Sequence, residues 1–273
     1  MEIPATGDQG ILISYNLKKL HNLKIIKGQF FEASSSEESH FTRLYLRLRK
    51  TEGRIYNNRQ VADLPSVPVS HRYYREWKMR GYSCRKLQQY IEKHRHICNI
   101  LEIGCGNGWL SANLSRIIKG SVTGIDINSF EIQQARKVFR ELPQVSFVEG
   151  DIRSGILEDS KYDMIFFAAS IQYFFSLKEI INVALAHLTL QGEIHIIDSY
   201  LYKPHQINEA KERSRKYFID VGVPEMTQFY FHHNINDLTP FKYHFLKNPA
   251  SLFGKVRVHK NPFHWVVIKN YKI

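Results

Sequence analysis

From Asn99 onward, short apolar runs alternate with segments of helical periodicity, and no other feature of this sequence restricts its fold as strongly. Five such runs, at residues 99–103, 121–126, 144–148, 162–167 and 193–197, have the length and apolar character of buried strands. Strands separated by helical segments are typical of parallel sheets, in which each helix crosses back over one face of the sheet. The pattern therefore predicts an α/β fold with a mostly parallel sheet.

The segments around these strands carry signals for helices. Helices are expected at residues 73–94, broken near Gly81, at 109–118, ended by Gly120, and at 208–220. Capping-box spacing marks two further helix starts, Asn128 with Glu131 and Ser176 with Glu179.

Two more strands are expected at residues 241–246 and 263–269. Because no long helical pattern separates them, they should pair antiparallel. The prediction is therefore a three-layer α/β fold, with a mostly parallel seven-stranded sheet that ends in an antiparallel hairpin.

Length and composition agree with one globular α/β domain that carries additional segments. The chain has 273 residues, of which 43% are hydrophobic and 23% charged. We predict an N-terminal extension of uncertain structure at 1–70 and an α/β domain at 71–273. Its core is expected at 99–200. The segments 71–95 and 201–240 are expected on the side of the functional site that binds the substrate, here called the acceptor.

Targeting and cysteine patterns favour a cytoplasmic protein. The first residues lack a basic segment followed by an apolar run, and no stretch of eighteen apolar residues follows, so neither secretion nor a membrane span is expected. The three cysteines show no metal-ligand spacing, so we expect no disulfide framework and no metal site.

The net charge of +12 is concentrated on the flanks. Residues 41–100 hold 14 Lys and Arg against 4 Asp and Glu, and residues 241–273 hold 7 against none, whereas residues 101–200 hold 8 against 12. A positive field around a cleft attracts an anionic acceptor such as nucleic acid, a phosphorylated sugar or lipid, or a carboxylate. A solvated basic surface without any partner is the alternative.

A glycine-rich turn follows the first predicted strand. In Gly104-x-Gly106-x-Gly108 the missing side chains let the backbone approach a ligand and expose helix N-terminal amides. The fingerprint of dinucleotide-binding proteins is close to this pattern. Asp126, about twenty residues further on, fits an acid that binds ribose hydroxyls, whether the cofactor is a dinucleotide or another ribose-containing molecule.

Three features separate this turn from the dinucleotide fingerprint. Glu102 precedes the first glycine by two residues, the glycines alternate strictly, and a second carboxylate, Asp151, follows the third predicted strand. Such a carboxylate accepts a hydrogen bond from an adenine amino group, while the next residue packs on the ring.

These motifs resemble the successive motifs of the class I S-adenosylmethionine-dependent methyltransferases, as does the later segment Leu188-Thr-Leu-Gln-Gly192-Glu. The resemblance is dense over residues 99–200 and looser from residue 71 to the end. The resemblance implies a Rossmann-like methyltransferase fold and the cofactor S-adenosylmethionine. It assigns the following residues to the cofactor: Gly104 and Gly106 to the methionine and ribose part, with Glu102 and Cys105 beside them; Asp126 to the ribose diol, with Ile127 against the adenine; Asp151 and Ile152 to the adenine edge; and Ala168 or Ala169 to the amino-acid end.

An aromatic and basic helix precedes the first predicted strand. Related enzymes often cover the cofactor with such a helix, so Tyr73 is expected near the sulfonium, Arg80 at the methionine carboxylate and Trp77 beside the acceptor. The alternative is that the helix only docks on the sheet.

Residues that select the acceptor should follow the fourth predicted strand. Ser170, Gln172 and Tyr173 are candidates to line the acceptor site. The segment lacks the Asn/Asp-Pro-Pro-aromatic and Pro-Cys motifs of base methyltransferases, which disfavours those two kinds of base methylation. His232 and His233 are the candidate general bases, because an imidazole with a near-neutral pKa suits deprotonation of a hydroxyl.

The sequence thus favours an enzyme that methylates a small molecule, a sugar or a lipid-linked glycan, most simply on oxygen and with an anionic acceptor. An RNA methyltransferase is the first alternative, suggested by the basic flanks, although no recognisable RNA-binding module is attached. A non-catalytic S-adenosylmethionine-binding protein and an NAD-dependent oxidoreductase are the others.

Overall fold

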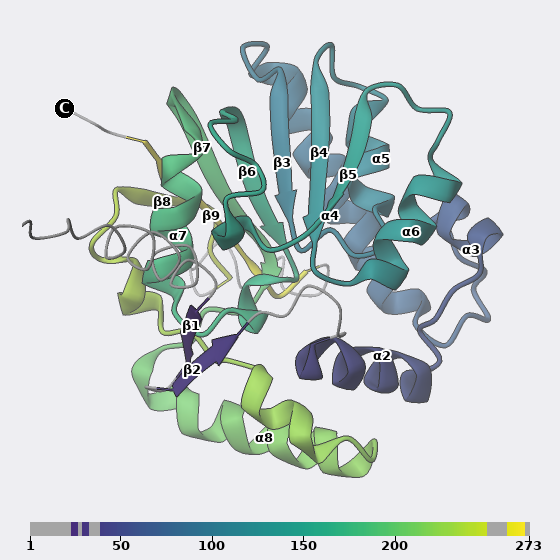
Figure 1. Ribbon diagram of the computed structural model, residues 1–273, viewed down its shortest axis with the longest axis vertical. Coiled ribbons are helices and arrows are strands. Elements are labelled where there is room, and N and C mark those ends of the chain that lie inside the picture. The colour runs from purple at the N-terminus through teal and green to yellow at the C-terminus, as the bar shows by residue number, and fades with distance from the viewer. Residues whose placement is uncertain (1–22, 27–28, 33–38, 250–260, 271–273) are drawn as a thin grey trace, which may run out of the picture. The chain divides into compact units, whose positions relative to one another are not determined.

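The computed structural model describes residues 23–26, 29–32, 39–249 and 261–270 (Figure 1). The chain divides into two compact units, Met1–Ser39 and His40–Ile273. In the first unit, β1 (Leu23–Ile26) pairs antiparallel with β2 (Gln29–Glu32). All other elements belong to the second unit.

The second unit is built on a seven-stranded sheet with the strand order β5-β4-β3-β6-β7-β9-β8. Its strands are β3 (Asn99–Ile103), β4 (Ser121–Asp126), β5 (Val145–Glu149), β6 (Tyr162–Ala168), β7 (Leu188–Ser199), β8 (Tyr243–Lys247) and β9 (His264–Lys269). The first five are parallel, and β9 pairs antiparallel with both β7 and β8. The predicted parallel sheet with an antiparallel end is confirmed.

The chain order reverses in the middle of this sheet. From β3 the chain moves outward through β4 to β5 and then returns to β6, on the other side of β3. The crevice at such a reversal, outside the carboxyl ends of the strands, is where ligands bind in open α/β sheets.

Helices cover both faces of the sheet. They are α2 (His40–Glu52), α3 (Asn58–Asp63), α4 (Tyr74–Lys93), α5 (Trp109–Ser115), α6 (Ser129–Val138), α7 (Leu177–Ala186) and α8 (Ile207–Asp220). Side chains of a strand alternate between faces, so Met164 and Phe166 of β6 pack in the cluster with α4, α5 and α6, whereas Ile165 and Phe167 pack in the cluster with α7. No described helix combines the length and the apolar character that crossing a membrane requires.

The predicted capping residues do cap their helices. The Asn128 side chain accepts from the Glu131 amide at the start of α6, and Ser176 does the same for Glu179 at the start of α7. These short-range contacts were predictable because they depend on sequence spacing alone.

The predicted break near Gly81 is wrong, because α4 continues through it from Tyr74 to Lys93. A Cβ atom on Gly81 would lie 3.3 Å from Cγ of Pro65. The glycine therefore allows close packing of α4 against the turn that follows α3.

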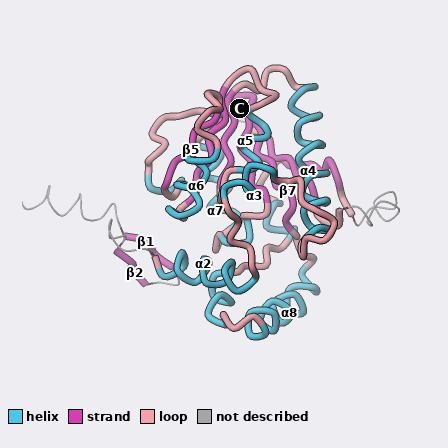
Figure 2. The backbone as a smooth tube through the Cα atoms, turned by 90° about the vertical axis from the view of Figure 1, so that its right-hand side faces the viewer, coloured by secondary structure: helices cyan, strands magenta, loops and turns pink. Residues whose placement is uncertain are grey.

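Helices α2 and α8 lie beyond the carboxyl ends of the parallel strands (Figures 1 and 2). Leu44 and Leu48 of α2 pack with Phe218 of α8 and with Met226. Residues 40–70, predicted as part of an N-terminal extension, therefore lie in the same compact unit as the sheet, and the division between the units falls after Ser39.

Gly120, in the loop between α5 and β4, provides a test of how closely this loop packs against the backbone of Cys98. The helix already ends at Ser115, so Gly120 does not end it, but a Cβ atom on Gly120 would lie 2.1 Å from the Cys98 carbonyl oxygen. We expect Gly120→Ala to lower the free energy of unfolding by about 1–3 kcal/mol, because backbone must move to relieve the clash. Urea denaturation measures this, with exposed Lys119→Ala as the control; equal stability of the two variants would contradict it.

Candidate active site

The glycine turn after β3 has a backbone that side chains would not tolerate. Gly104, Gly106 and Gly108 have φ angles of 75°, 53° and 74°, in the left-handed region. A Cβ atom on Gly104 would lie 2.6 Å from Cβ of Ser170, and one on Gly108 would lie 2.3 Å from the Phe147 ring. Backbone conformation and lack of space therefore both require glycine here.

Asp126 holds this turn in place from the end of β4. One carboxylate oxygen accepts from the Gly106 amide at 2.8 Å, and the other accepts from the Asn128 amide at 2.9 Å. A carboxylate has about four acceptor positions, so Asp126 keeps capacity for further hydrogen bonds.

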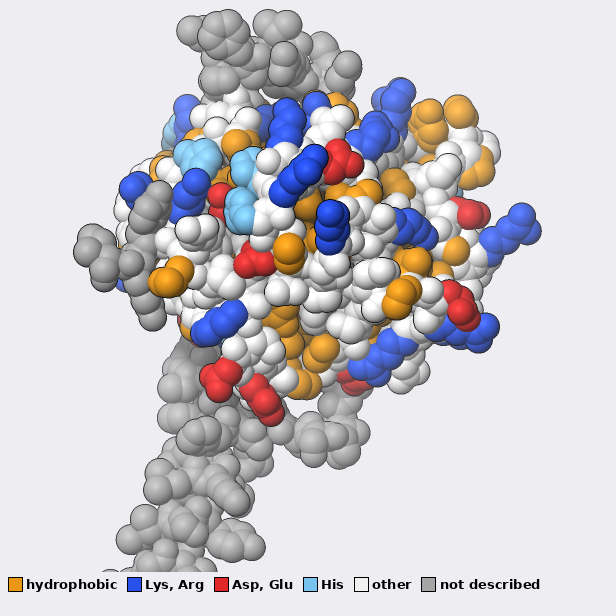
Figure 3. Space-filling model, turned by 90° about the horizontal axis from the view of Figure 1, so that it is seen from above, with side chains coloured by type: hydrophobic (Ala, Val, Ile, Leu, Met, Phe, Trp, Pro, Cys, Tyr) orange, Lys and Arg blue, Asp and Glu red, His pale blue; other side chains and the backbone are white. Residues whose placement is uncertain are grey.

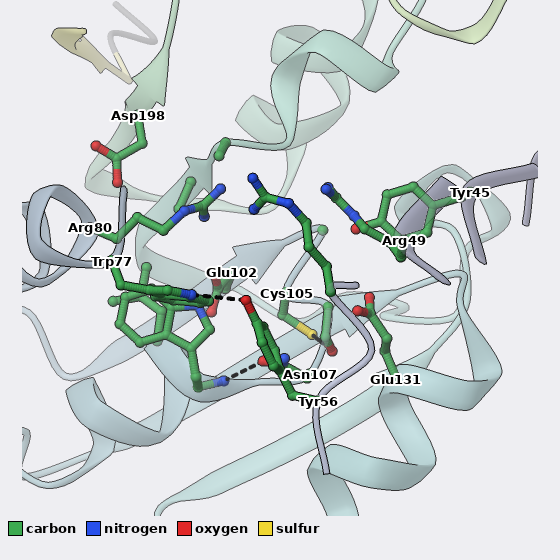
Figure 4. A pocket seen from close by; sticks show the side chains of 17 residues that line it. Tyr45, Arg49, Tyr56, Trp77, Arg80, Glu102, Cys105, Asn107, Glu131 and Asp198 are labelled. Carbon is green, nitrogen blue, oxygen red and sulfur yellow. Dashed lines mark hydrogen bonds between the residues drawn. The ribbon is translucent and has the colours of Figure 1, made fainter. Parts of the chain in front are cut away.

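A pocket opens over this turn at the carboxyl ends of β3, β6 and β7 (Figure 4). We call it the central pocket. Eight of the predicted site residues line it: Trp77, Arg80, Glu102, Gly104, Cys105, Gly106 and both candidates for the amino-acid end, Ala168 and Ala169. Its other lining residues are Tyr45, Arg49, Arg54, Tyr56, Asn107, Trp109, Leu110, Glu131 and Asp198.

Glu102 is a buried carboxyl group of this pocket, with 3% of the residue exposed. Burial raises its pKa to about 8, although the Ser111 hydroxyl, which donates to Oε2, acts in the opposite direction. Near neutral pH a positive group arriving in the pocket would therefore favour ionisation of Glu102.

Two carboxyl groups lie together at the other end of the glycine turn. A Cβ atom on Gly106 would lie 3.0 Å from Oε2 of Glu131, which faces the same space as Asp126. Burial raises the pKa of both acids, and the charge of Asp126 raises the pKa of Glu131 further, whereas Arg49 of α2 lowers it. Paired carboxyl groups of this kind suit the two hydroxyls of a ribose.

Arginine side chains enter the central pocket from α2, from the segment that follows α2 and from α4 (Figure 4). Glu76 joins two of them: it accepts from Arg54 at 2.9 and 2.5 Å and from Arg80 at 3.0 Å. Burial by itself would raise the pKa of Glu76, but these two cations lower it to about 2. The ion pairs position both guanidinium groups toward the pocket.

The predicted adenine-side residues lie outside the described lining of the central pocket. Ile127 is 40% exposed after β4, and Ile152 is buried. Both oxygens of Asp151 accept from Arg153, at 2.9 and 2.6 Å.

Tyr73 and Ser170 contact the site indirectly. The Tyr73 hydroxyl donates to the Glu52 carbonyl at 2.6 Å, and its ring lies 3.7 Å from the Arg54 guanidinium carbon, so it supports Arg54 rather than lining the pocket. Ser170 is buried behind Gly104 and donates to the Ile103 carbonyl at 2.6 Å.

Gln172 and Tyr173 are likewise outside the described pocket wall. The Gln172 amide donates to the Ala169 carbonyl at 2.6 Å. The Tyr173 hydroxyl accepts from Arg49 at 3.3 Å, and its ring makes edge contacts with Tyr45 and Tyr230.

The structure does not bring His232 or His233 to the central pocket. His232 contacts the Ser214 hydroxyl at 2.9 Å, and burial lowers its pKa to about 4. His233 is buried, and its Nε2 lies 3.0 Å from the Ile171 carbonyl oxygen, where it must donate. Both imidazoles therefore have structural contacts away from the glycine turn.

Helix α2 contributes side chains to the central pocket, a role that was not predicted from the sequence. Tyr45 and Arg49, four residues apart on one helical face, both line the central pocket. The apolar stripe of Phe41, Leu44 and Leu48 has helical spacing and could have revealed the helix. Which surface its other face would cover depends on packing against α8, which no local pattern indicates.

A Rossmann-like sheet with a glycine turn and carboxylates at the ends of neighbouring strands defines a nucleotide-cofactor-binding α/β enzyme fold. A family model described as "Methyltransferase domain" matches residues 94–244, more than half of the chain. The chain therefore belongs to the class I S-adenosylmethionine-dependent methyltransferases, a family whose cofactor is S-adenosylmethionine.

Curated relatives match over shorter segments. The release factor glutamine methyltransferase of Fusobacterium nucleatum is 36% identical over 85 residues, 30% of this chain and 23% of that protein. The malonyl-(acyl-carrier protein) O-methyltransferase of Priestia megaterium is 36% identical over 96 residues, 35% of this chain and 34% of that protein. The matched segments thus span about a quarter and a third of these relatives.

Solved structures share the fold. The YcgJ protein from Bacillus subtilis has a TM-score of 0.55 at 13% identity, covering 71% of this chain and 100% of that chain. The plantazolicin methyltransferase BpumL, solved in complex with SAH, has a TM-score of 0.51 at 17% identity, covering 84% and 100%. At these identities the likeness is one of fold.

The raised pKa of Glu102 predicts that the difference in unfolding free energy between Glu102→Gln and the parent protein depends on pH. In the unfolded chain the carboxyl titrates near pH 4.5, and in the folded protein near pH 8, so the stability it contributes is complete below about pH 4.5 and is lost as pH rises to about 8. Glu102→Gln stays neutral, so without ligand it should become progressively more stable than the parent over this window.

Urea denaturation at several pH values between about 5 and 8 measures this difference. Glu141→Gln, at an exposed acid, is the matched control and should show no such trend. A constant difference between Glu102→Gln and the parent across this range would contradict the prediction.

Proposed function

We propose that this protein transfers the methyl group of S-adenosylmethionine to an oxygen atom of a small molecule, a sugar or a lipid-linked glycan. The observation that supports it most directly is the central pocket itself, which combines a side-chain-free turn with carboxyl groups at one end and guanidinium groups at the other. The residues present therefore fit this cofactor in chemical type.

Each part of the cofactor has suitable groups in the chain. Asp126 and Glu131 suit the ribose hydroxyls, and Gly104 and Gly106 leave room for the sugar and the methionine chain. Arg80 suits the methionine carboxylate, and the buried carboxyl of Glu102 suits its ammonium group. Asp151 and Ile152 stay assigned to the adenine edge.

The protein has a modest chemical task in this reaction. When bound, S-adenosylmethionine supplies an electrophilic methyl group on a positively charged sulfur. The chain must orient the acceptor within about 3 Å of that carbon, exclude water and accept a proton when the acceptor is a hydroxyl. Helix α2, with Tyr45 and Arg49 in the pocket wall, covers the site and suits water exclusion.

An anionic small molecule is the acceptor that the charges favour. Arg49, Arg54 and Arg80 all reach the central pocket, and guanidinium groups bind carboxylate and phosphate oxygens. The face at the opposite ends of the parallel strands has Lys and Arg spread among acidic and apolar side chains (Figure 3). The name of the Priestia megaterium relative, an O-methyltransferase, also supports oxygen as the acceptor atom.

Calorimetry with S-adenosylmethionine, S-adenosylhomocysteine and NAD tests the cofactor assignment. We expect the first two to bind and NAD not to. Asp126→Asn should weaken their binding about tenfold or more, because the ribose loses a charged acceptor. Asp159→Asn, at an exposed acid, is the control. Binding of NAD alone would refute the cofactor, and unchanged affinity of Asp126→Asn would refute its role.

The acceptor class requires a transfer assay. Tritium-labelled S-adenosylmethionine is incubated with the protein and with hydroxyl-bearing acids, sugar phosphates, lipid-linked glycans or total transfer RNA. We expect label in one of the first three groups, as a methyl ether or ester identified by mass spectrometry. Labelling of RNA alone, with binding that falls steeply with salt, would instead identify an RNA methyltransferase.

A further inference from the structure

Asp198, at the carboxyl end of β7, is a buried carboxylate to which none of the roles above is assigned. It is 9% exposed, and its backbone φ of 52° lies in the left-handed region, which residues other than glycine seldom adopt. Strained backbone persists where the surrounding structure imposes it, and it is concentrated in functional sites.

Two side chains fix the orientation of this carboxylate. The Ser83 hydroxyl donates to Oδ1 at 2.5 Å, and the Asn261 amide donates to the same oxygen at 3.2 Å. Asn261 also donates to the Ser83 oxygen at 2.8 Å, which closes the network. Among the residues that the structure describes, none donates a hydrogen bond to Oδ2, so this oxygen is available to a ligand.

Asp198 lies where two pockets meet. It lines the central pocket and also a second cavity of about 450 Å³, which we call the side pocket. The side pocket is lined by Arg75, Glu76, Met79 and Arg80 of α4, together with Pro262 and Phe263 before β9. The Glu76 carboxylate is paired with Arg54 and Arg80. The side pocket thus combines apolar surface for a ring with an exposed guanidinium for an anionic group.

The order of the strands in the sheet indicates where the acceptor would lie relative to the cofactor. The carboxyl ends of β4, β3, β6 and β7, which are consecutive in the sheet, carry Asp126, Gly104, Ala168 and Asp198 in that order. If the ribose lies at β4 and the methionine chain at β3 and β6, the next position along the edge is at β7. An acceptor in the side pocket would therefore approach the methyl group past Asp198.

We propose that Asp198 is the general base of the methyl transfer and that the side pocket binds an aromatic carboxylic acid bearing a hydroxyl group. This inference rests on the O-methyltransferase function proposed above. As the hydroxyl oxygen bonds to the methyl carbon, its proton passes to Oδ2 of Asp198. The electron pair of the broken sulfur–methyl bond stays on sulfur, and the proton later leaves to water.

The surroundings of Asp198 suit a base. Burial raises its pKa, while the Ser83 hydroxyl, Arg80 of α4, the Asn261 amide and Lys247 of β8 act in the opposite direction. A carboxylate of raised pKa accepts a proton more readily than an exposed one, and these neighbours keep its charged form accessible.

The test measures binding as well as activity. Meta-hydroxybenzoate and benzoate, which lacks the hydroxyl, are titrated calorimetrically into protein saturated with S-adenosylhomocysteine. We expect the parent to bind meta-hydroxybenzoate about tenfold more tightly, as a hydrogen bond to a charged acceptor predicts. Asp198→Asn, which tolerates the left-handed backbone, should lose this preference, and Asp159→Asn should keep it.

A transfer assay on the same probe provides the second readout. With tritium-labelled S-adenosylmethionine, Asp198→Asn should methylate meta-hydroxybenzoate about a hundredfold more slowly than the parent, while its affinity for S-adenosylhomocysteine stays within about threefold.

Three results would overturn the inference and leave the proposed function intact. They are no binding of meta-hydroxybenzoate, equal affinity of the parent for both probes, and a loss of more than about tenfold in S-adenosylhomocysteine affinity in Asp198→Asn, which would place Asp198 in the cofactor site. If the parent does not bind S-adenosylhomocysteine, the proposed function itself fails.

Discussion

The hydrogen bond from the Gly106 amide to Asp126 is the contact on which the site depends most. It ties the turn after β3, whose three glycines have left-handed conformations, to the end of β4 at 2.8 Å. The other oxygen of Asp126 accepts from Asn128, whose side chain in turn caps α6. One carboxylate thus sets the position of the turn, the start of α6 and, through that helix, Glu131.

Helix α2 adds charge and cover to this frame. Arg49 is held by Glu52 at 2.9 Å and by the Tyr173 hydroxyl at 3.3 Å, and it opposes the raised pKa of Glu131. A guanidinium remains ionised even when buried, so it needs such partners. The same contacts explain why Tyr173, a candidate acceptor residue, instead positions Arg49.

Local sequence signals predicted the sheet well because strands and caps are short-range features. The bounds of β3 and β4 match the predicted runs, and Asn128 and Ser176 cap as expected. The errors have a common cause. Gly81 is accommodated by contact with Pro65, and His232 and His233 are held by distant partners, so packing between remote segments overrode the local pattern.

The α/β class, the glycine turn and the carboxylates at the ends of successive strands could be predicted from the order of amino acids alone, because these features depend on periodicity and fixed spacing. Which polar side chains meet at the carboxyl edge of the sheet depends instead on the packing of the whole fold. Arg49, Glu131 and Asp198 are far apart in the chain, yet the strand order and the packing of α2 and α4 bring them to one pocket. Long-range contacts of this kind have no signature in local sequence, since they depend on how the elements pack.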